Sequence, residues 1–318
     1  MPQSDYISVN EYPGGILAID SGFMRDRMAS CYLLESGSEV AFIETGTNAS
    51  VPRLLQVLKH RGWSKNAVRY VIVTHIHLDH AGGAGSLMQQ LPEATFLVHP
   101  RGARHMNDPA RLEASVRSVY GDRVYDSTYG VLVPIDASRT RQMHDGDTIR
   151  LGQRELLFAD TPGHARHHFC IWDDRSRGWF SGDTFGLSYR ELDTDQGHFI
   201  FPTTTPIEFD PDALKASVGR LLEMNPEYMY LTHYGRVGDV PRLAAQLLDG
   251  VETLVQIAER YKDSDHRHRD ISKGIAQWLF RSARAHGVTL TEDALRTVLQ
   301  PDIELNTQGI EVWLDRRQ

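Results

Sequence analysis

Short apolar runs alternate with polar and glycine-containing breaks over residues 15–45. The runs lie at residues 15–19, 29–34 and 40–43, and glycine, serine and charged residues separate them. Runs of this length between turn-forming residues are typical of antiparallel strands. We therefore expect a meander of strands that forms a first sheet.

The next stretch changes from a helical to a strand pattern. Leu54, Leu55 and Leu58 recur at helical spacing, and Gly62 follows as a stop signal, which predicts a helix over residues 51–61. The run at 70–73 is apolar on both faces, which predicts a buried strand. A helix that leads into a buried strand indicates a layered α/β fold.

Four predicted strands end in the same way, with a small turn residue and a metal-competent side chain. They are residues 70–73, 155–159, 179–180 and 228–231. Because functional side chains in α/β folds collect at strand ends, these four ends can meet in one cleft. The candidate side chains at these four ends are His75, His164, Asp183 and His233.

Residues 186–206 are rich in aromatic residues, proline and threonine and have no clear period, so we expect a long loop. Asp210 and Pro211 then supply an N-cap and a first-turn proline for a helix. From residue 241 the strand signals largely stop. We expect three amphipathic helices over residues 243–258, 270–286 and 291–299. Asp270 would cap the second of them.

The predicted organisation is a catalytic domain of residues 1–240 and a helical C-terminal extension of residues 241–318. The apolar helix faces of the extension must be buried, either against the catalytic domain or in a homodimer. The extension would then wall the substrate cleft or act as a structural buttress. Between two of its helices, the basic run at 266–269 is expected to be a solvated linker rather than a binding patch.

Composition fits a soluble globular protein, with 318 residues of which 41% are hydrophobic and 24% charged. A net charge of −8 argues against a non-specific nucleic-acid binder, although it leaves a local basic patch open. We expect a small-molecule substrate and no nucleic-acid partner. The two cysteines, Cys31 and Cys170, form no ligand pair, which disfavours disulfides and thiolate metal sites. No secretory signal or apolar membrane-spanning run is visible, so we expect a cytoplasmic protein without a membrane partner.

The segment 74–83 carries three imidazoles and a carboxylate within six residues, namely His75, His77, Asp79 and His80. In an extended backbone His75 and His77 point the same way and can reach one ion, while Asp79 and His80 turn to a second. The alternative is a surface loop with Asp79 as a helix cap. Imidazole and carboxylate without thiolate suit zinc, iron or manganese. We expect two divalent ions, with zinc favoured.

These residues resemble the metallo-β-lactamase superfamily, whose signature is HxHxDH followed by a distal His, a distal Asp and a final His. The resemblance covers about residues 15–235 and implies an αββα sandwich, a layered α/β (α+β) fold. It also implies that the first metal is held by His75, His77 and His164, the second by Asp79, His80 and His233, and that Asp183 bridges both. Each of the distal ligands has an alternative role when it is considered alone. His164 could be a core histidine, Asp183 a turn residue and His233 a strand-end cap.

One departure from the family pattern is Glu44, which precedes Thr45-Gly46 where superfamily members usually have Asp. A glutamate there can still orient a histidine ring from a backbone set slightly further back. The pair His167 and His168 is expected to lie around the ligands or on the surface rather than to bind metal directly.

By this resemblance, the chain is a dinuclear metallohydrolase that uses a metal-bound hydroxide, with Asp79 and Asp183 as catalytic residues. Residues 161–164 and 181–184 resemble the glyoxalase II and lactonase branches, which favours a thioester or another activated ester such as a lactone. The aromatic loop would shape an acyl pocket, or simply pack in the core. The alternatives are a phosphodiesterase or nuclease of the same fold, which the acidic net charge disfavours, and a regulatory or partner-binding protein that retains the metal site.

Overall fold

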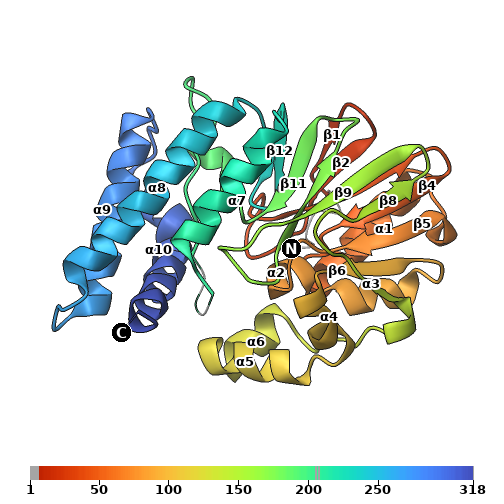
Figure 1. The fold of residues 1–318 in the computed structure, drawn as a ribbon, viewed down its shortest axis with the longest axis horizontal. Coiled ribbons are helices and arrows are strands. Elements are labelled where there is room, and N and C mark those ends of the chain that lie inside the picture. The colour runs from red at the N-terminus through yellow and green to blue at the C-terminus, as the bar shows by residue number, and fades with distance from the viewer. Residues whose placement is uncertain (1–6, 205, 207, 318) are drawn as a thin grey trace, which may run out of the picture. The chain divides into compact units, whose positions relative to one another are not determined.

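The computed structural model describes residues 7–204, 206 and 208–317. The chain divides into two compact units (Figure 1). The first unit consists of residues 1–160, 167–182 and 228–236, and the second of residues 161–166, 183–227 and 237–318. A domain boundary at residue 240 stays a prediction.

The first sheet has seven strands in sequence order. Strands β1 to β4 pair antiparallel, which confirms the predicted meander, and β4 to β7 pair parallel. Parallel neighbours need crossover segments, and helices form most of them here. The strands are β1 Val9–Tyr12, β2 Ile16–Asp20, β3 Ser30–Ser36, β4 Glu39–Ile43, β5 Val68–Ile72, β6 Thr95–Val98 and β7 Thr140–Gln142.

The second sheet has six strands in the order β13-β12-β11-β10-β9-β8. Strands β8 to β11 pair antiparallel, and β11 pairs parallel with β12. The three later strands predicted from the sequence all belong to this sheet. The strands are β8 Thr148–Leu151, β9 Arg154–Asp160, β10 Phe169–Asp173, β11 Gly178–Gly182, β12 Tyr228–Leu231 and β13 Gly235–Val237.

The two sheets pack face to face, and helices cover the other face of the first sheet (Figure 1). In β2, Ile16 and Ala18 pack with residues of the second sheet, while Leu17 and Ile19 face the helical layer. Burial on both faces explains why these strands read as continuous apolar runs. The helical layer comes from α1 Val51–His60, α2 Leu78–Ala81, α3 Ala84–Gln90 and α4 Pro100–Asn107.

Helices α5 Ala110–Tyr120 and α6 Asp122–Thr128 form a smaller hydrophobic cluster. Tyr125 and Leu132 pack there against Leu78, which lies between two predicted metal ligands. Helices α3 to α6 and strands β6 to β8 were not predicted from the sequence. Four short 3-10 helices complete this description: η1 Asn48–Ser50, η2 Lys65–Ala67, η3 Ala137–Arg139 and η4 Arg190–Leu192.

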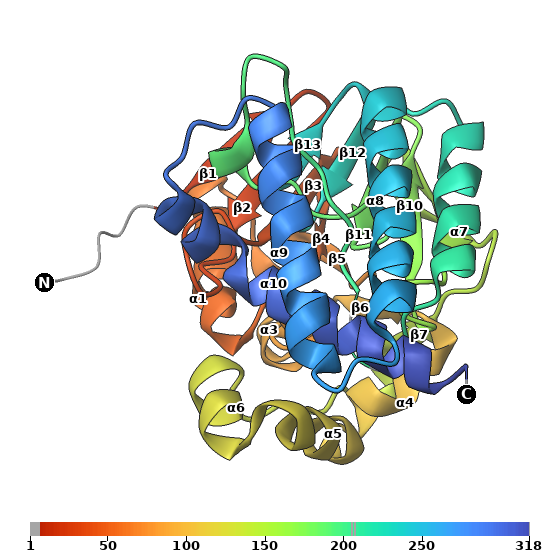
Figure 2. The same ribbon diagram turned by 90° about the vertical axis from the view of Figure 1, so that its left-hand side faces the viewer.

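The second unit is mainly helical, with α7 Pro211–Glu223, α8 Val240–Tyr261, α9 Arg267–Ala285 and α10 Glu292–Asp315. The predicted cap of α7 is confirmed, because the Asp210 carboxylate accepts hydrogen bonds from the backbone of Asp212 and Ala213. Figure 2 shows α7, α8 and α9 side by side, with α10 running obliquely across α8 and α9. Among the described residues, no helix is both long and apolar enough to cross a membrane.

The loop expected at 186–206 is largely irregular, apart from η4 and isolated bridges between Leu187 and Phe201 and between Thr194 and Gly197. Residue 205 lies outside the described residues. Its aromatic side chains Tyr189, Phe199 and Phe201 are at most 1% exposed. They pack inside the second unit, so the packing interpretation of this loop is the one that the structure supports.

Two predicted helix boundaries are wrong. Helix α9 begins at Arg267, so Asp270 lies in its first turn and His266 is the N-cap. Helix α10 does not end at Leu299 but continues through Pro301 to Asp315. The proline removes one backbone hydrogen bond. Burial of the apolar residues along the whole helix outweighs that loss, and these residues are Leu295, Leu299, Ile303, Ile310 and Leu314.

The run at 266–269 is largely exposed, as predicted, but it is not a linker, because it forms the start of α9 and pairs with acidic residues of α10. Arg267 Nη1 lies 2.8 Å from Asp315 Oδ1, and Arg267 Nε lies 3.3 Å from Glu311 Oε1. His268 Nδ1 lies 2.8 Å from Glu311 Oε2. The partners are distant in the sequence, so local charge patterning did not reveal them.

The pair between His268 and Glu311 predicts a pH-dependent stability. Hydrogen bonding to Glu311 raises the pKa of His268 above its usual 6.5. A raised pKa in the folded state gives stabilisation that is complete below the unfolded pKa and is lost as pH rises through the folded pKa. We expect His268→Gln to lower the free energy of unfolding more at about pH 5.5 than at about pH 9. The loss should stay below about 1 kcal/mol, since exposed pairs are screened.

Urea unfolding at the two pH values measures this effect, with His144→Gln as the control at an exposed histidine. An equal loss of stability at both pH values would contradict a contribution from the charged imidazole.

Candidate metal centre

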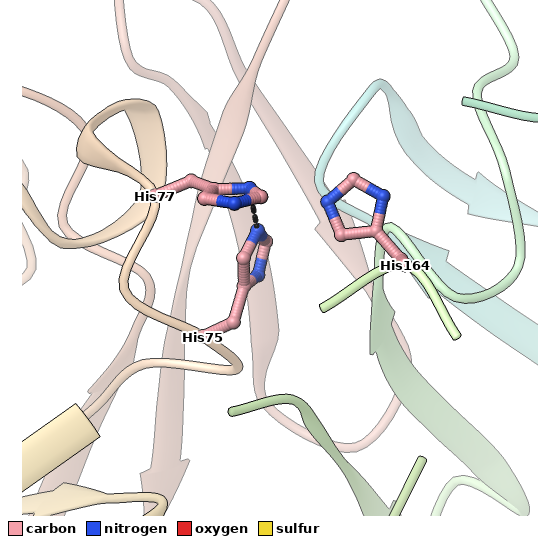
Figure 3. Close-up of side chains that lie close together, drawn as sticks. All are labelled: His75, His77 and His164. Atoms are coloured by element: carbon pink, nitrogen blue, oxygen red, sulfur yellow. Dashed lines mark hydrogen bonds between the residues drawn. The ribbon is translucent and has the colours of Figure 1, made fainter. Parts of the chain in front are cut away.

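The HxHxDH segment follows β5 and is fixed by the hydrophobic residues between its histidines. Ile76 and Leu78 are 2% and 4% exposed and pack into two separate hydrophobic clusters. His75 is fully buried, and its Nε2 lies 2.8 Å from His77 Nδ1 (Figure 3). The N-cap of α2 is His77, so the structure does not support the alternative of a surface loop capped by Asp79.

Asp79, His80 and His233 form a compact cluster within the first unit. Their potential ligand atoms lie within 4.8 Å of one another. Asp79 Oδ2 lies 3.2 Å from His233 Nε2 and 3.6 Å from His80 Nε2. The imidazoles come from the start of α2 and the end of β12, so the cluster joins the edges of the two sheets.

Both imidazoles in this cluster have their second nitrogen bound to an oxygen. His80 Nδ1 lies 3.1 Å from Glu44 Oε1, and His233 Nδ1 lies 2.8 Å from the carbonyl oxygen of Met28. Carbonyl and carboxylate oxygens only accept, so Nδ1 carries the proton and Nε2 presents a lone pair on the side of Asp79. Histidines that bind metals are held in this way. Two imidazole nitrogens and one carboxylate therefore fit a divalent ion.

Glu44 supports the cluster through its contact with His80, as its place in the sequence predicts. Its side chain is buried and accepts hydrogen bonds from Thr74 Oγ1 at 2.5 Å and Thr232 Oγ1 at 3.3 Å, besides its contact with His80. Each threonine directly precedes a predicted ligand. The backbone of Glu44 has a φ of 63°, in the left-handed region that side chains rarely adopt. The carboxylate thus holds three strand ends in a fixed relation.

His168 lies around the ligands, which is one of the two places expected for it from the sequence. It is fully buried, and its ring stacks on His75 with centroids 4.8 Å apart. His167 Nδ1 lies 3.4 Å from the backbone nitrogen of Ile76. A Cβ atom on Gly182 would lie only 2.5 Å from His168 Nε2, so the turn that leads to the predicted ligand after it requires glycine. No periodic signal in the sequence marked this second layer of histidines.

The second unit brings together the other two predicted ligands, His164 and Asp183. Both are buried, and His164 Nε2 lies 3.3 Å from Asp183 Oδ2. His164 Nδ1 lies 3.4 Å from the carbonyl oxygen of Thr203, so this imidazole repeats the arrangement of His80 and His233. Figure 3 draws its ring with those of the first two histidines of the motif.

The turn before His164 is fixed by close packing. Gly163 has a φ of 130°, and a Cβ atom there would lie 2.3 Å from the backbone nitrogen of Leu214 at the start of α7. The backbone of Asp210 donates to Gly163, and Thr184 Oγ1 donates to Thr161. The two turns of the second unit that carry predicted ligands are therefore tied to each other and to a helix.

Residues 24–233 match the family model of the metallo-β-lactamase superfamily. The match covers more than half of the 318-residue chain, and the chain belongs to this superfamily. Its two packed sheets with helices are the metallo-β-lactamase sandwich fold, followed by C-terminal helices.

Three known proteins illustrate the similarity. The metallo-β-lactamase fold-containing protein ST1585 of Sulfurisphaera tokodaii is 28% identical over 53% of this chain and 61% of its own length. Its crystal structure matches the fold with a TM-score of 0.67 and 23% identity, over 93% of this chain and 98% of that one. A hydroxyacylglutathione hydrolase of a Methylobacterium strain is 28% identical, over 55% of this chain and 50% of that protein.

The third is the human acyl-coenzyme A thioesterase MBLAC2, which is 29% identical over 53% of this chain and 63% of its own length. The matched region thus spans half to less than two thirds of these three relatives in sequence.

The position of Glu44 predicts a role in metal binding. Glu44→Gln keeps the shape of the side chain and removes the charge that holds His80, so the affinity for a divalent ion should fall about 10-fold to 100-fold. Competition with a chromophoric chelator measures this affinity. Glu35→Gln is the control, since Glu35 is bonded to Arg61 on the surface of the same unit. Equal affinities in the two variants would contradict the role of Glu44.

Proposed function

We propose that this protein is a metal-dependent hydrolase that cleaves thioesters or other activated esters, including lactones. The observation that carries the proposal is the set of polar neighbours around the ring nitrogens of His80, His164 and His233. Each has Nδ1 beside an oxygen acceptor and Nε2 beside an aspartate carboxylate. Such preorganised donors are expected of a metal centre rather than of core histidines.

The resemblance to the superfamily supports a centre of two divalent ions, with zinc favoured and iron or manganese as alternatives. By this resemblance, His75, His77 and His164 would hold one ion, Asp79, His80 and His233 the other, and Asp183 would be shared by both. The proposed ligands are imidazoles and carboxylates. Cys31 and Cys170 are buried in β3 and β10 and are not among them. When bound, such ions polarise a carbonyl and supply a nucleophile by lowering the pKa of water from 15.7 to about 7.

Asp79 and Asp183 are the proposed catalytic residues. The side chain of Asp79 is 22% exposed, whereas those of its neighbours His80 and His233 are 0% and 6% exposed. Asp79 is therefore the member of its cluster that water or substrate can reach most easily. A carboxylate in that position can orient a water molecule and take up its proton.

Exposed apolar side chains on two loops of the first unit are the proposed binding surface for the acyl part of the substrate. Met24 is 66% exposed and Val131 is 74% exposed, and Phe23, next to Met24 in the sequence, stacks with Tyr129, two residues before Val131. The carbonyl oxygen of Met28, in the first loop, lies 2.8 Å from His233 Nδ1, and Leu132, next to Val131, packs with Leu78 between two proposed ligands. Relatives named as a thioesterase and a hydroxyacylglutathione hydrolase further support an acyl substrate.

Asp79→Ala should leave the fold intact and lower kcat at least about 100-fold, because it removes a metal-binding and proton-accepting carboxylate. The protein prepared without chelator should contain two metal ions per chain, and this variant fewer. Elemental analysis and hydrolysis rates measure both quantities, with exposed Asp122→Ala as the control. A wild-type protein that still binds one ion after reconstitution would contradict the dinuclear centre.

Substrate selectivity provides a separate test. Thioesters or lactones should be hydrolysed with higher kcat/KM than bis(p-nitrophenyl)phosphate, and Met24→Ser or Val131→Ser should raise KM for long acyl chains more than for acetyl esters. Met224→Ser, at an exposed methionine that follows α7, is the control. A higher kcat/KM for the phosphodiester would instead favour a phosphodiesterase. If neither class is turned over by the metal-loaded protein, the hydrolase proposal is wrong.

A further inference from the structure

The last helix of the chain, α10, carries a buried polar residue that is bonded outside the helix. Asn306 is fully buried. Its Oδ1 accepts a hydrogen bond from the backbone nitrogen of Thr204 at 2.5 Å, and its Nδ2 donates to the carbonyl of Pro202 at 3.3 Å. Thr204 Oγ1 in turn donates to the carbonyl of Asn306 at 3.0 Å. One amide side chain therefore fixes the residues on both sides of Thr203.

The residue held between these contacts is the partner of a proposed metal ligand. The carbonyl of Thr203 lies 3.4 Å from His164 Nδ1, and both residues belong to the second unit. An oxygen acceptor at Nδ1 requires the tautomer with its proton there and leaves the lone pair on Nε2. Nε2 is the atom that lies 3.3 Å from Asp183. The direction of the Thr203 carbonyl thus sets both the tautomer and the rotation of the His164 ring.

Helix α10 packs closely against the same loop at Gly309. A Cβ atom on Gly309 would lie 2.7 Å from Thr204 Oγ1 and 2.9 Å from its carbonyl carbon and oxygen, so only glycine lets the helix come this close. One turn before Asn306, Asp302 Oδ1 accepts a hydrogen bond from Tyr189 at 3.0 Å. Polar groups buried at such a contact are costly unless they are bonded, which indicates that α10 specifies the position of the loop.

We propose that Asn306 is a positioning residue for the metal centre and that α10 orients His164 through residues 202–204. The inference rests on the proposed function in one respect, namely that His164 binds a metal ion. A purely structural role for the helix would instead affect only stability, so metal affinity distinguishes the two.

The test uses the full-length protein and two variants. Asn306→Leu removes both side-chain bonds to the loop, and Thr204→Val removes only the hydroxyl bond and keeps the shape of the residue. Thr307→Val is the matched control, because Thr307 is equally buried on α10 and its hydroxyl donates within its own helix, to the carbonyl of Ile303 at 2.7 Å. Zn²⁺ affinity is measured by chelator competition, and thermal unfolding is measured with and without Zn²⁺.

Asn306→Leu should weaken the binding of one Zn²⁺ ion about 10-fold to 100-fold, as expected when a partner of a metal-binding histidine is lost. Thr204→Val should weaken it less, and Thr307→Val should lower the melting temperature without changing Zn²⁺ affinity. If Asn306→Leu does not fold, Thr204→Val decides the question. Zn²⁺ affinities that equal the control would overturn the proposal.

A parallel measurement on His164→Ala separates this inference from the proposed function. If His164→Ala loses one Zn²⁺ ion while Asn306→Leu and Thr204→Val do not, the metal centre stands and the role of α10 is wrong. If His164→Ala binds Zn²⁺ like the wild type, His164 is not a ligand, and both the centre as proposed and the inference fail.

Discussion

The arrangement of the candidate site in the first unit depends on one buried carboxylate, that of Glu44. It accepts hydrogen bonds from Thr74 at the end of β5, from His80 in α2 and from Thr232 at the end of β12. The first sheet and the second sheet each supply part of this set, so the carboxylate holds their edges together. A buried charge is tolerated only when such partners surround it. The strained backbone of Glu44 is consistent with a position selected for its site rather than for stability.

His80, His164 and His233 share one arrangement, in which an oxygen acceptor lies beside Nδ1. His80 uses a carboxylate, whereas His164 and His233 use backbone carbonyls, and in each case an element far away in the sequence provides the acceptor. The acceptors fix which nitrogen keeps its proton before any ion arrives. Metal binding then needs little reorganisation of the rings, which favours affinity by reducing the entropy lost on binding.

The sequence predicted those features that depend on local patterns. The HxHxDH segment, the strand ends and the Asp210 cap follow from spacing and residue type, and the structure contains them. Local patterns could not reveal interactions between distant residues. The pairing of Arg267 with Asp315, the burial of His168 and the continuation of α10 through Pro301 all depend on tertiary packing. The helices of residues 84–128 were missed for a different reason, since no motif drew attention to them.

Both units are assembled from separate stretches of the chain, and this has a consequence for biosynthesis. The first unit cannot complete its second sheet before β12 and β13 have been made, and the loop that contacts His164 lacks Asn306 until α10 emerges. At about 5–20 residues per second, that helix follows His233 from the ribosome by several seconds. Glu44 and Met28 are made before His80 and His233, which they contact, whereas His164 is made before Thr203 and Asn306. The surroundings of His164 are therefore completed later during synthesis than those of His80 and His233.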